Sequence, residues 1–259
     1  METIPYLSLA AFAFLAGLVD AVSGGGGLIQ LPALLVAFPS TPVVQLLGTN
    51  KFASCFGTTV ALIRYYRTHA LPLKILLVAA GTAFCFSFLG AYSVSILDPS
   101  FLRPLVIVAL ALVLIYTVSK PTLGASCTAP LTKGKKQKVI TLLVTGSIGG
   151  VLGFYDGFFG PGAGSFMLVA LITLLGFDFI RASTLAKMMN VATNLAALAY
   201  FIPNGNVNFK LGFAMATANI IGSIVGAHLA LTKGARFVRL VLITVVVLLL
   251  SKQVTQLIS

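Results

Sequence analysis

Residues 17–28 read GLVDAVSGGGGL, and residues 153–164 read GFYDGFFGPGAG. Asp20 of the first stretch recurs as Asp156, 136 residues later, and three glycines match at the same offset. The two stretches therefore indicate an internal repeat.

Basic residues further along the chain keep this offset. Lys51 recurs as Lys187, and Lys74 recurs as Lys210. Two copies of one membrane unit with a pathway between them form the plan of many transporters. The predicted units are a first membrane repeat, a basic cytoplasmic linker and a second membrane repeat, at residues 1–119, 120–138 and 139–259.

The composition excludes a soluble domain. The chain is 58% hydrophobic and 8% charged, with a mean hydropathy of +1.06, more apolar side chain than a soluble domain of this size can bury. Nine apolar runs approach or reach spanning length, and they lack the alternation of barrel strands. We predict an all-α polytopic membrane protein with 8–10 transmembrane or broken segments, four to five in each half.

The net charge of +12 lies mostly in short loops and in the predicted linker. This pattern follows the positive-inside rule and does not resemble a nucleic-acid-binding surface, so we expect a lipid bilayer and no nucleic acid as partner.

The loop charges also bear on the orientation of the two halves in the membrane. If eight helices form two parallel halves, ten basic residues fall on the cytoplasmic side and five on the outside. If the halves are inverted, the split becomes twelve and three. The stronger excess of basic residues on the cytoplasmic side favours inverted repeats, and the parallel arrangement of four plus four helices stays open.

Both glycine-rich stretches predict breaks in membrane helices. Consecutive glycines disfavour a helix, and a proline interrupts the second stretch. Broken helices at membrane depth are tolerated where they line a cavity, and their free backbone amides suit an anion. Gly25, Gly26 and Gly162 are the candidate contributors. Close helix packing through small residues is the alternative interpretation.

The two repeated lysines are the main candidates for substrate binding. An unpaired lysine in hydrocarbon costs roughly 3 kcal/mol or more, and both lysines share a helix face with polar groups. The candidate residues for contacting a bound oxyanion are Lys51, Lys187, Thr49, Asn50, Ser54, Asn190 and Asn194. The alternative is that the lysines extend to the membrane interface. Replacement of either lysine by methionine is expected to abolish transport.

The repeated acids have two candidate roles. Asp20 and Asp156 could pair with the lysines, or they could carry protons during transport. The chain has two distant histidines, no metal-binding spacing and no ATP-binding loop motif, so we expect neither an enzyme nor a cofactor or metal. The oligomeric state is not predicted.

Three motifs support a family resemblance: GLVDAVSGGGGL at 17–28, GTNK at 48–51 and GFYDGFFGPGAGSF at 153–166. Over essentially its whole length the chain resembles the TauE/SafE sulfite exporter (toluene-sulfonate uptake permease, TSUP) family, and within it the bacterial YfcA-like branch. The resemblance implies a multi-pass carrier of the bacterial inner membrane for small sulfur oxyanions such as sulfite or organosulfonates. We expect an exporter with alternating access around a midplane site between Lys51 and Lys187. A passive anion channel and a carrier of another small anion, such as a carboxylate, are the alternatives.

Overall fold

The computed structural model describes residues 3–119 and 135–233, and every regular element in these ranges is an α-helix. The helices are α1 (Thr3–Ser23), α2 (Gly27–Ala37), α3 (Val43–Thr68), α4 (Leu73–Ser95), α5 (Pro99–Ser119), α6 (Lys135–Phe158), α7 (Ala163–Leu175), α8 (Phe179–Phe201) and α9 (Phe209–Lys233). The all-α prediction is confirmed. Residues 120–134 of the predicted linker lie outside the described ranges, and residues 135–138 form the first turn of α6.

Local sequence explains several helix ends. Pro42 and Pro72 lie directly before α3 and α4, with extended backbone that a helix does not continue through. The side chain of Asp178 accepts a hydrogen bond of 3.0 Å from the backbone N–H of Arg181 and caps α8. Gly176 ends α7 in the left-handed conformation.

The glycine-rich stretches separate α1 from α2 and α6 from α7. Gly24 has a φ of +77° and Gly160 a φ of +98°, a region that side chains other than glycine rarely adopt. Gly24 also packs against the backbone of Gly164, and the Ser165 hydroxyl donates a 2.7 Å hydrogen bond to the Ser23 carbonyl oxygen. The two breaks therefore meet each other inside the bundle.

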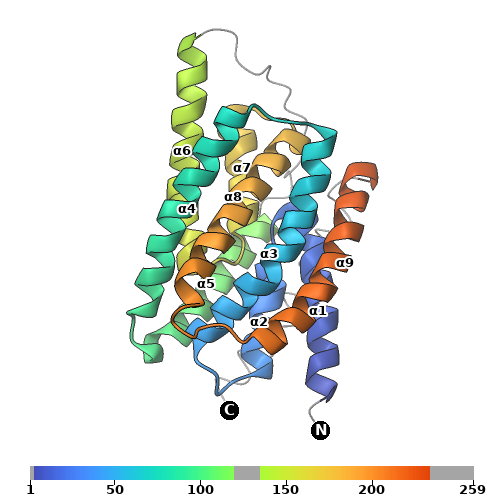
Figure 1. Ribbon diagram of the computed structural model, residues 1–259, viewed down its shortest axis with the longest axis vertical. Coiled ribbons are helices and arrows are strands. Elements are labelled where there is room, and N and C mark those ends of the chain that lie inside the picture. The colour runs from blue at the N-terminus through green and yellow to red at the C-terminus, as the bar shows by residue number, and fades with distance from the viewer. Residues whose placement is uncertain (1–2, 120–134, 234–259) are drawn as a thin grey trace.

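Figure 1 shows α3 and α8 crossing the middle of the bundle in opposite directions. One side of this central pair is formed by α4 and α6, which pack along each other, and the other side by α1 and α9. In the same way, α9 packs on α3 and α4 packs on α8. The arrangement places the middle of α3 and of α8, and both glycine-rich breaks, at the centre of the molecule.

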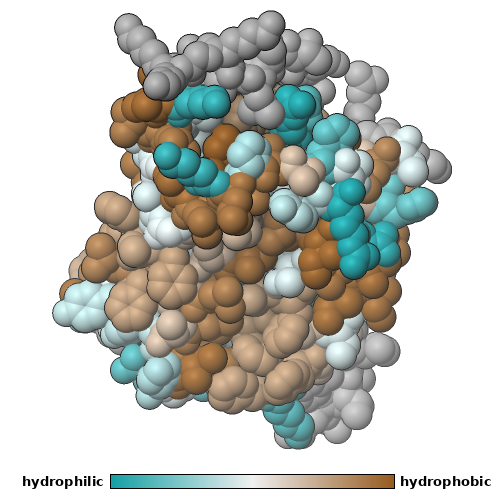
Figure 2. Space-filling model, turned by 45° about the horizontal axis from the view of Figure 1, so that its top comes forward, coloured by the Kyte–Doolittle hydropathy of each residue, from teal (hydrophilic) through white to brown (hydrophobic). Residues whose placement is uncertain are grey.

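The outer surface is largely apolar. Figure 2 shows hydrophobic residues over most of the face in view, and many large apolar side chains are exposed, including Leu77, Phe86, Leu112, Leu143 and Val151. Within the described ranges, Leu73–Ser95, Lys138–Phe158 and Phe209–Thr232 are long and apolar enough to cross a membrane. An apolar exterior of this extent indicates that the described helices contact lipid. The apolar run 237–250 lies outside the described residues.

Candidate functional site

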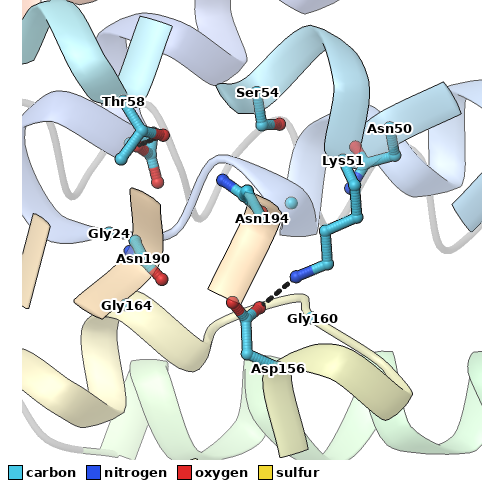
Figure 3. A pocket seen from close by; sticks show the side chains of 12 residues that line it. Gly24, Asn50, Lys51, Ser54, Thr58, Asp156, Gly160, Gly164, Asn190 and Asn194 are labelled. Carbon is cyan, nitrogen blue, oxygen red and sulfur yellow. Dashed lines mark hydrogen bonds and ion pairs between the residues drawn. The ribbon is translucent and has the colours of Figure 1, made fainter. Parts of the chain in front are cut away.

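A small cavity lies where the two broken helices meet the central helices. The cavity has a volume of about 30 Å³, enough for a water molecule. Figure 3 shows its polar side chains approaching from several helices. The lining residues are Asp20, Gly24, Gly27, Asn50, Lys51, Ser54, Thr58, Asp156, Gly160, Gly164, Asn190 and Asn194.

Lys51 on α3 forms an ion pair with Asp156 on α6. The Lys51 Nζ lies 2.6 Å from Asp156 Oδ1, and the two side chains are 4% and 5% exposed (Figure 3). The hydroxyl of Thr193 on α8 donates to the other carboxylate oxygen. Each oxygen of the buried Asp156 carboxylate therefore has one close donor.

Lys187 on α8 pairs with Asp20 on α1. Its Nζ lies 3.0 Å from Asp20 Oδ2 and also donates to the Asp20 backbone carbonyl. The Thr58 hydroxyl donates to the same Oδ2 at 3.0 Å. Both ion pairs therefore join the two halves of the sequence, Lys51 with Asp156 and Lys187 with Asp20.

Four neutral side chains of the cavity form no hydrogen bond with another described residue: Asn50, Ser54, Asn190 and Asn194. The Asn50 amide oxygen is also fully enclosed. Buried amides and hydroxyls usually have a partner, and each one without a partner costs about 1–3 kcal/mol. The side chains of Ser54, Asn190 and Asn194, which are not enclosed in this way, are available to a small polar molecule in the cavity.

The structure places the other predicted site residues away from the cavity lining. Lys187 lies behind Asp20. Thr49 donates to the Gln45 carbonyl and accepts from the Asn208 backbone N–H. Among the glycines, the lining positions are Gly24, Gly27, Gly160 and Gly164, and the predicted Gly25, Gly26 and Gly162 are their neighbours.

A buried amide pair behind Asn50 was not predicted from the sequence. Gln30 on α2 donates to the Asn50 backbone carbonyl at 3.4 Å, and Asn219 on α9 donates to the Gln30 side-chain oxygen at 2.9 Å. Both residues are at most 2% exposed. A single polar residue within the apolar run LIQLPALLVA is the signal that could have identified Gln30.

The described residues contain no group of three or more histidine, cysteine, aspartate or glutamate side chains that could hold a metal ion. The functional groups that this part of the chain offers at the cavity are ammonium, carboxylate, amide and hydroxyl groups and backbone amides.

Residues 9–252 match the family described as Sulfite exporter TauE/SafE. The chain belongs to this family. A probable membrane transporter protein of Haemophilus influenzae is 36% identical over 244 residues, which cover 93% of this chain and 91% of that protein. The probable membrane transporter protein YfcA of Escherichia coli is 34% identical over 233 residues, 90% of this chain and 83% of YfcA.

A more distant relative, the probable membrane transporter protein YdhB of Bacillus subtilis, is 24% identical over 83% of this chain and 86% of its own length. No solved structure matches the chain. The resemblance to the TauE/SafE family and to its YfcA-like members is confirmed. The described helices and these relatives together indicate a multi-pass membrane transporter.

Proposed function

We propose that this chain is a secondary transporter, and specifically an exporter, of small sulfur-containing oxyanions such as sulfite or organosulfonates in the bacterial inner membrane. The observation that carries the proposal is the cavity itself, in which the Lys51 ammonium lies beside neutral side chains without partners. An oxyanion accepts hydrogen bonds from an ammonium group and from amide or hydroxyl donors, and charge-assisted bonds of this kind are strong.

We propose further that two homologous, inverted halves alternate access to this cavity. The helix boundaries support the repeat, because α3 begins at Val43 and α8 at Phe179, 136 residues later, and α4 and α9 begin at Leu73 and Phe209 with the same offset. The opposite directions of α3 and α8 support the inversion (Figure 1). Transporters of this plan expose a fixed midplane site to each side in turn by moving one half against the other.

Lys51 would bind the anion directly, in exchange for one oxygen of Asp156. The anion would then leave the buried Asp156 carboxylate without its cation, which is unfavourable. Uptake of a proton by Asp156 would remove this cost and couple anion movement to protons, whereas a purely structural role would require the pair to stay closed. Lys187, held by two oxygens of Asp20, would set the position and charge of Asp20 at the cavity wall.

Flux of sulfite and of small sulfonates into proteoliposomes tests the proposal. The variant Lys51→Met with Asp156→Asn removes both charges of the pair, so the fold keeps no unpaired carboxylate. Native protein is expected to give saturable flux, and the double variant is expected to lose it while it elutes as a monodisperse species. Saturable sulfite flux of native magnitude in that variant would contradict a site at Lys51.

Two alternatives use the same residues. A passive anion channel would give ohmic, non-saturating current that does not depend on anion on the opposite side. A carrier of carboxylates would show saturable flux of small carboxylates and none of sulfite. The ammonium and amide groups at the cavity would serve all three functions, and the family match to sulfite exporters favours the sulfur oxyanion.

A further inference from the structure

A groove on the outside of the bundle lies between α4 and α6. It has a volume of about 720 Å³, within the range of about 300–1,000 Å³ that is usual for pockets holding small organic ligands. Leu143 and Val151 line it and are exposed, on a helix long and apolar enough to cross a membrane. This α4–α6 groove therefore opens toward lipid.

Glycines of α6 bring the two helices together. Gly153 and Gly157 approach the backbone of Ala83 and Ser87 so closely that a side chain at either glycine would collide with it. Both steps along the contact are four residues long, so α4 and α6 run in the same direction and begin at the same end of the bundle (Figure 1).

The groove opens beside this line of contact, where two further glycines of α6 carry no side chain. A Cβ at Gly146 would lie 3.4 Å from a methyl group of Val78, and one at Gly150 would lie 3.5 Å from the Phe86 ring. These are ordinary contact distances, so the two glycines leave space that a larger group can occupy.

Two exposed lysines, Lys74 of α4 and Lys138 of α6, lie beyond one end of the groove. Each is followed at four-residue intervals by groove-lining residues, Val78, Thr82 and Phe86 on α4 and Leu142, Gly146 and Gly150 on α6. Residues four apart share one face of a helix, so each lysine lies on the face that lines the groove. Neither lysine forms an ion pair with another described residue.

The two lysines can reach one phosphate group. Because Gly153 is level with Ala83, Lys74 is level with residue 144, and Lys138 lies about 9 Å further along the axis. Two flexible four-carbon side chains can span this separation. An apolar groove that leads to two cations matches the acyl chain and the negatively charged headgroup of a lipid.

The corresponding face of α1 and α9 has different residues. At the offset of 136 residues, Gly150 corresponds to Phe14 and Lys138 corresponds to Glu2. A large ring therefore stands where Gly150 leaves space, and the sequence has an acid where α6 has a lysine. This difference makes the α1–α9 face an internal control.

We propose that the α4–α6 groove binds an acyl chain of an anionic phospholipid whose phosphate is held by Lys74 and Lys138. A second copy of this chain is the competing occupant, because small residues on membrane helices also support helix packing. Two copies with the same membrane orientation would form a two-fold dimer and would bring four lysines together at one end. Like charges repel, whereas a phosphate neutralises the lysines, so the charges favour the lipid. Such a site does not depend on which anion the protein transports.

Quenching of tryptophan fluorescence by brominated lipid tests the site. The chain contains no tryptophan, so Val151→Trp places a single reporter in the groove, and Ile221→Trp places one on the exposed face of α9. Each variant is reconstituted in vesicles of dioleoyl phosphatidylcholine that contain a small fraction of brominated phosphatidylglycerol or, in a parallel series, of brominated phosphatidylcholine. The ratio of the two quenching efficiencies gives the local preference for the anionic lipid.

The expected result is a preference of at least about fivefold for phosphatidylglycerol at Val151→Trp, the effect of one basic residue near an anionic headgroup, and no preference at Ile221→Trp. Equal quenching by the two lipids at Val151→Trp would overturn the proposal. Protection of this tryptophan from both brominated lipids would also overturn it and would assign the groove to a second copy of the chain.

Further substitutions in the Val151→Trp background separate the headgroup site from the groove. Lys74→Gln with Lys138→Gln should abolish the preference, whereas Lys210→Gln, at the exposed position that corresponds to Lys74, should leave it unchanged. Gly150→Phe copies the corresponding residue of α1 and should also abolish the preference, because it fills the groove while both lysines remain. A preference that persists in the double lysine variant or in Gly150→Phe would overturn the proposal.

Discussion

The two lysine–aspartate pairs follow the same sequence spacing but have different surroundings. Lys51 lines the cavity and contacts one oxygen of Asp156, whose other oxygen accepts from a threonine. Lys187 lies behind Asp20 and contacts two of its oxygens, and the Asp20 side chain is 13% exposed. Two lysines at the same sequence spacing therefore lie differently: Lys51 lines the cavity, and Lys187 contacts a carboxylate that lines it.

The largest expected effect comes from removing one charge of each pair. Lys51→Met and Lys187→Met each leave a carboxylate without its cation, and for the buried pair of Lys51 and Asp156 this costs about 3–5 kcal/mol. Each carboxylate would keep one threonine donor, and the loss should be greater for Lys51→Met because the Asp156 side chain is 5% exposed and that of Asp20 is 13% exposed. The measurement is thermal unfolding of the purified variants in detergent.

The charge-neutral double variants are the controls for this comparison. Lys51→Met with Asp156→Asn should recover most of the stability and still lack saturable flux. Lys187→Met with Asp20→Asn should recover the stability and retain measurable flux. If only the second pair proved indispensable for flux, the roles assigned to the two lysines would have to be exchanged.

A second, smaller effect concerns the threonine beside each carboxylate. Thr193→Val removes the donor of one Asp156 oxygen, so we expect a loss of about 1.5–3 kcal/mol, as for hydrogen bonds to charged groups. Thr58→Val should cost less, because Asp20 Oδ2 keeps Lys187. Thr59→Val is the control, since its hydroxyl bonds to the backbone carbonyl of Cys55 and not to a carboxylate. Equal losses at Thr193 and Thr58 would argue that the two carboxylates have equivalent surroundings.

The two pairs also show which parts of the fold and of the site could be predicted from the sequence. Composition and the two glycine-rich stretches predicted an all-helical bundle with interrupted helices, because apolar content and helix-breaking residues act locally. The polar residues one and two turns after each lysine were predicted to share its face, and Ser54, Asn190 and Asn194 line the cavity. Helical spacing determines such neighbours without knowledge of the tertiary structure.

Partners from distant helices could not be predicted in this way. The crossed pairing of Lys51 with Asp156, and the position of Lys187 behind Asp20, depend on how α1, α3, α6 and α8 pack. Thr49 illustrates the same limit, because its hydroxyl bonds to the backbone of its own helix and of residue 208 instead of facing the cavity. The rotation of a helix about its axis, set by packing across the bundle, decides which of several polar residues reaches the site.

The smallest expected effect concerns the buried amide pair of Gln30 and Asn219, which holds the backbone of Asn50 next to Lys51 and is called the amide anchor here. The positions that correspond to them at the 136-residue offset are occupied by Phe166 and Ala83. Gln30→Leu and Asn219→Leu each remove a neutral amide bond worth about 1 kcal/mol, and in a double-mutant cycle the two losses should be non-additive by a similar amount. The measurement is again thermal unfolding of the single and double variants.

Transport kinetics reveal what this anchor does beyond stability. Gln30 holds the backbone of Asn50, next to Lys51, so its loss should let the first cavity-lining turn of α3 shift. We expect Gln30→Leu to raise the KM for sulfite more than it lowers the maximal rate, because the binding geometry changes while the ion pairs stay intact. An unchanged KM with a measurable stability loss would show that the amide pair only supports packing, and the difference between the two lysines would then depend on their carboxylate partners alone.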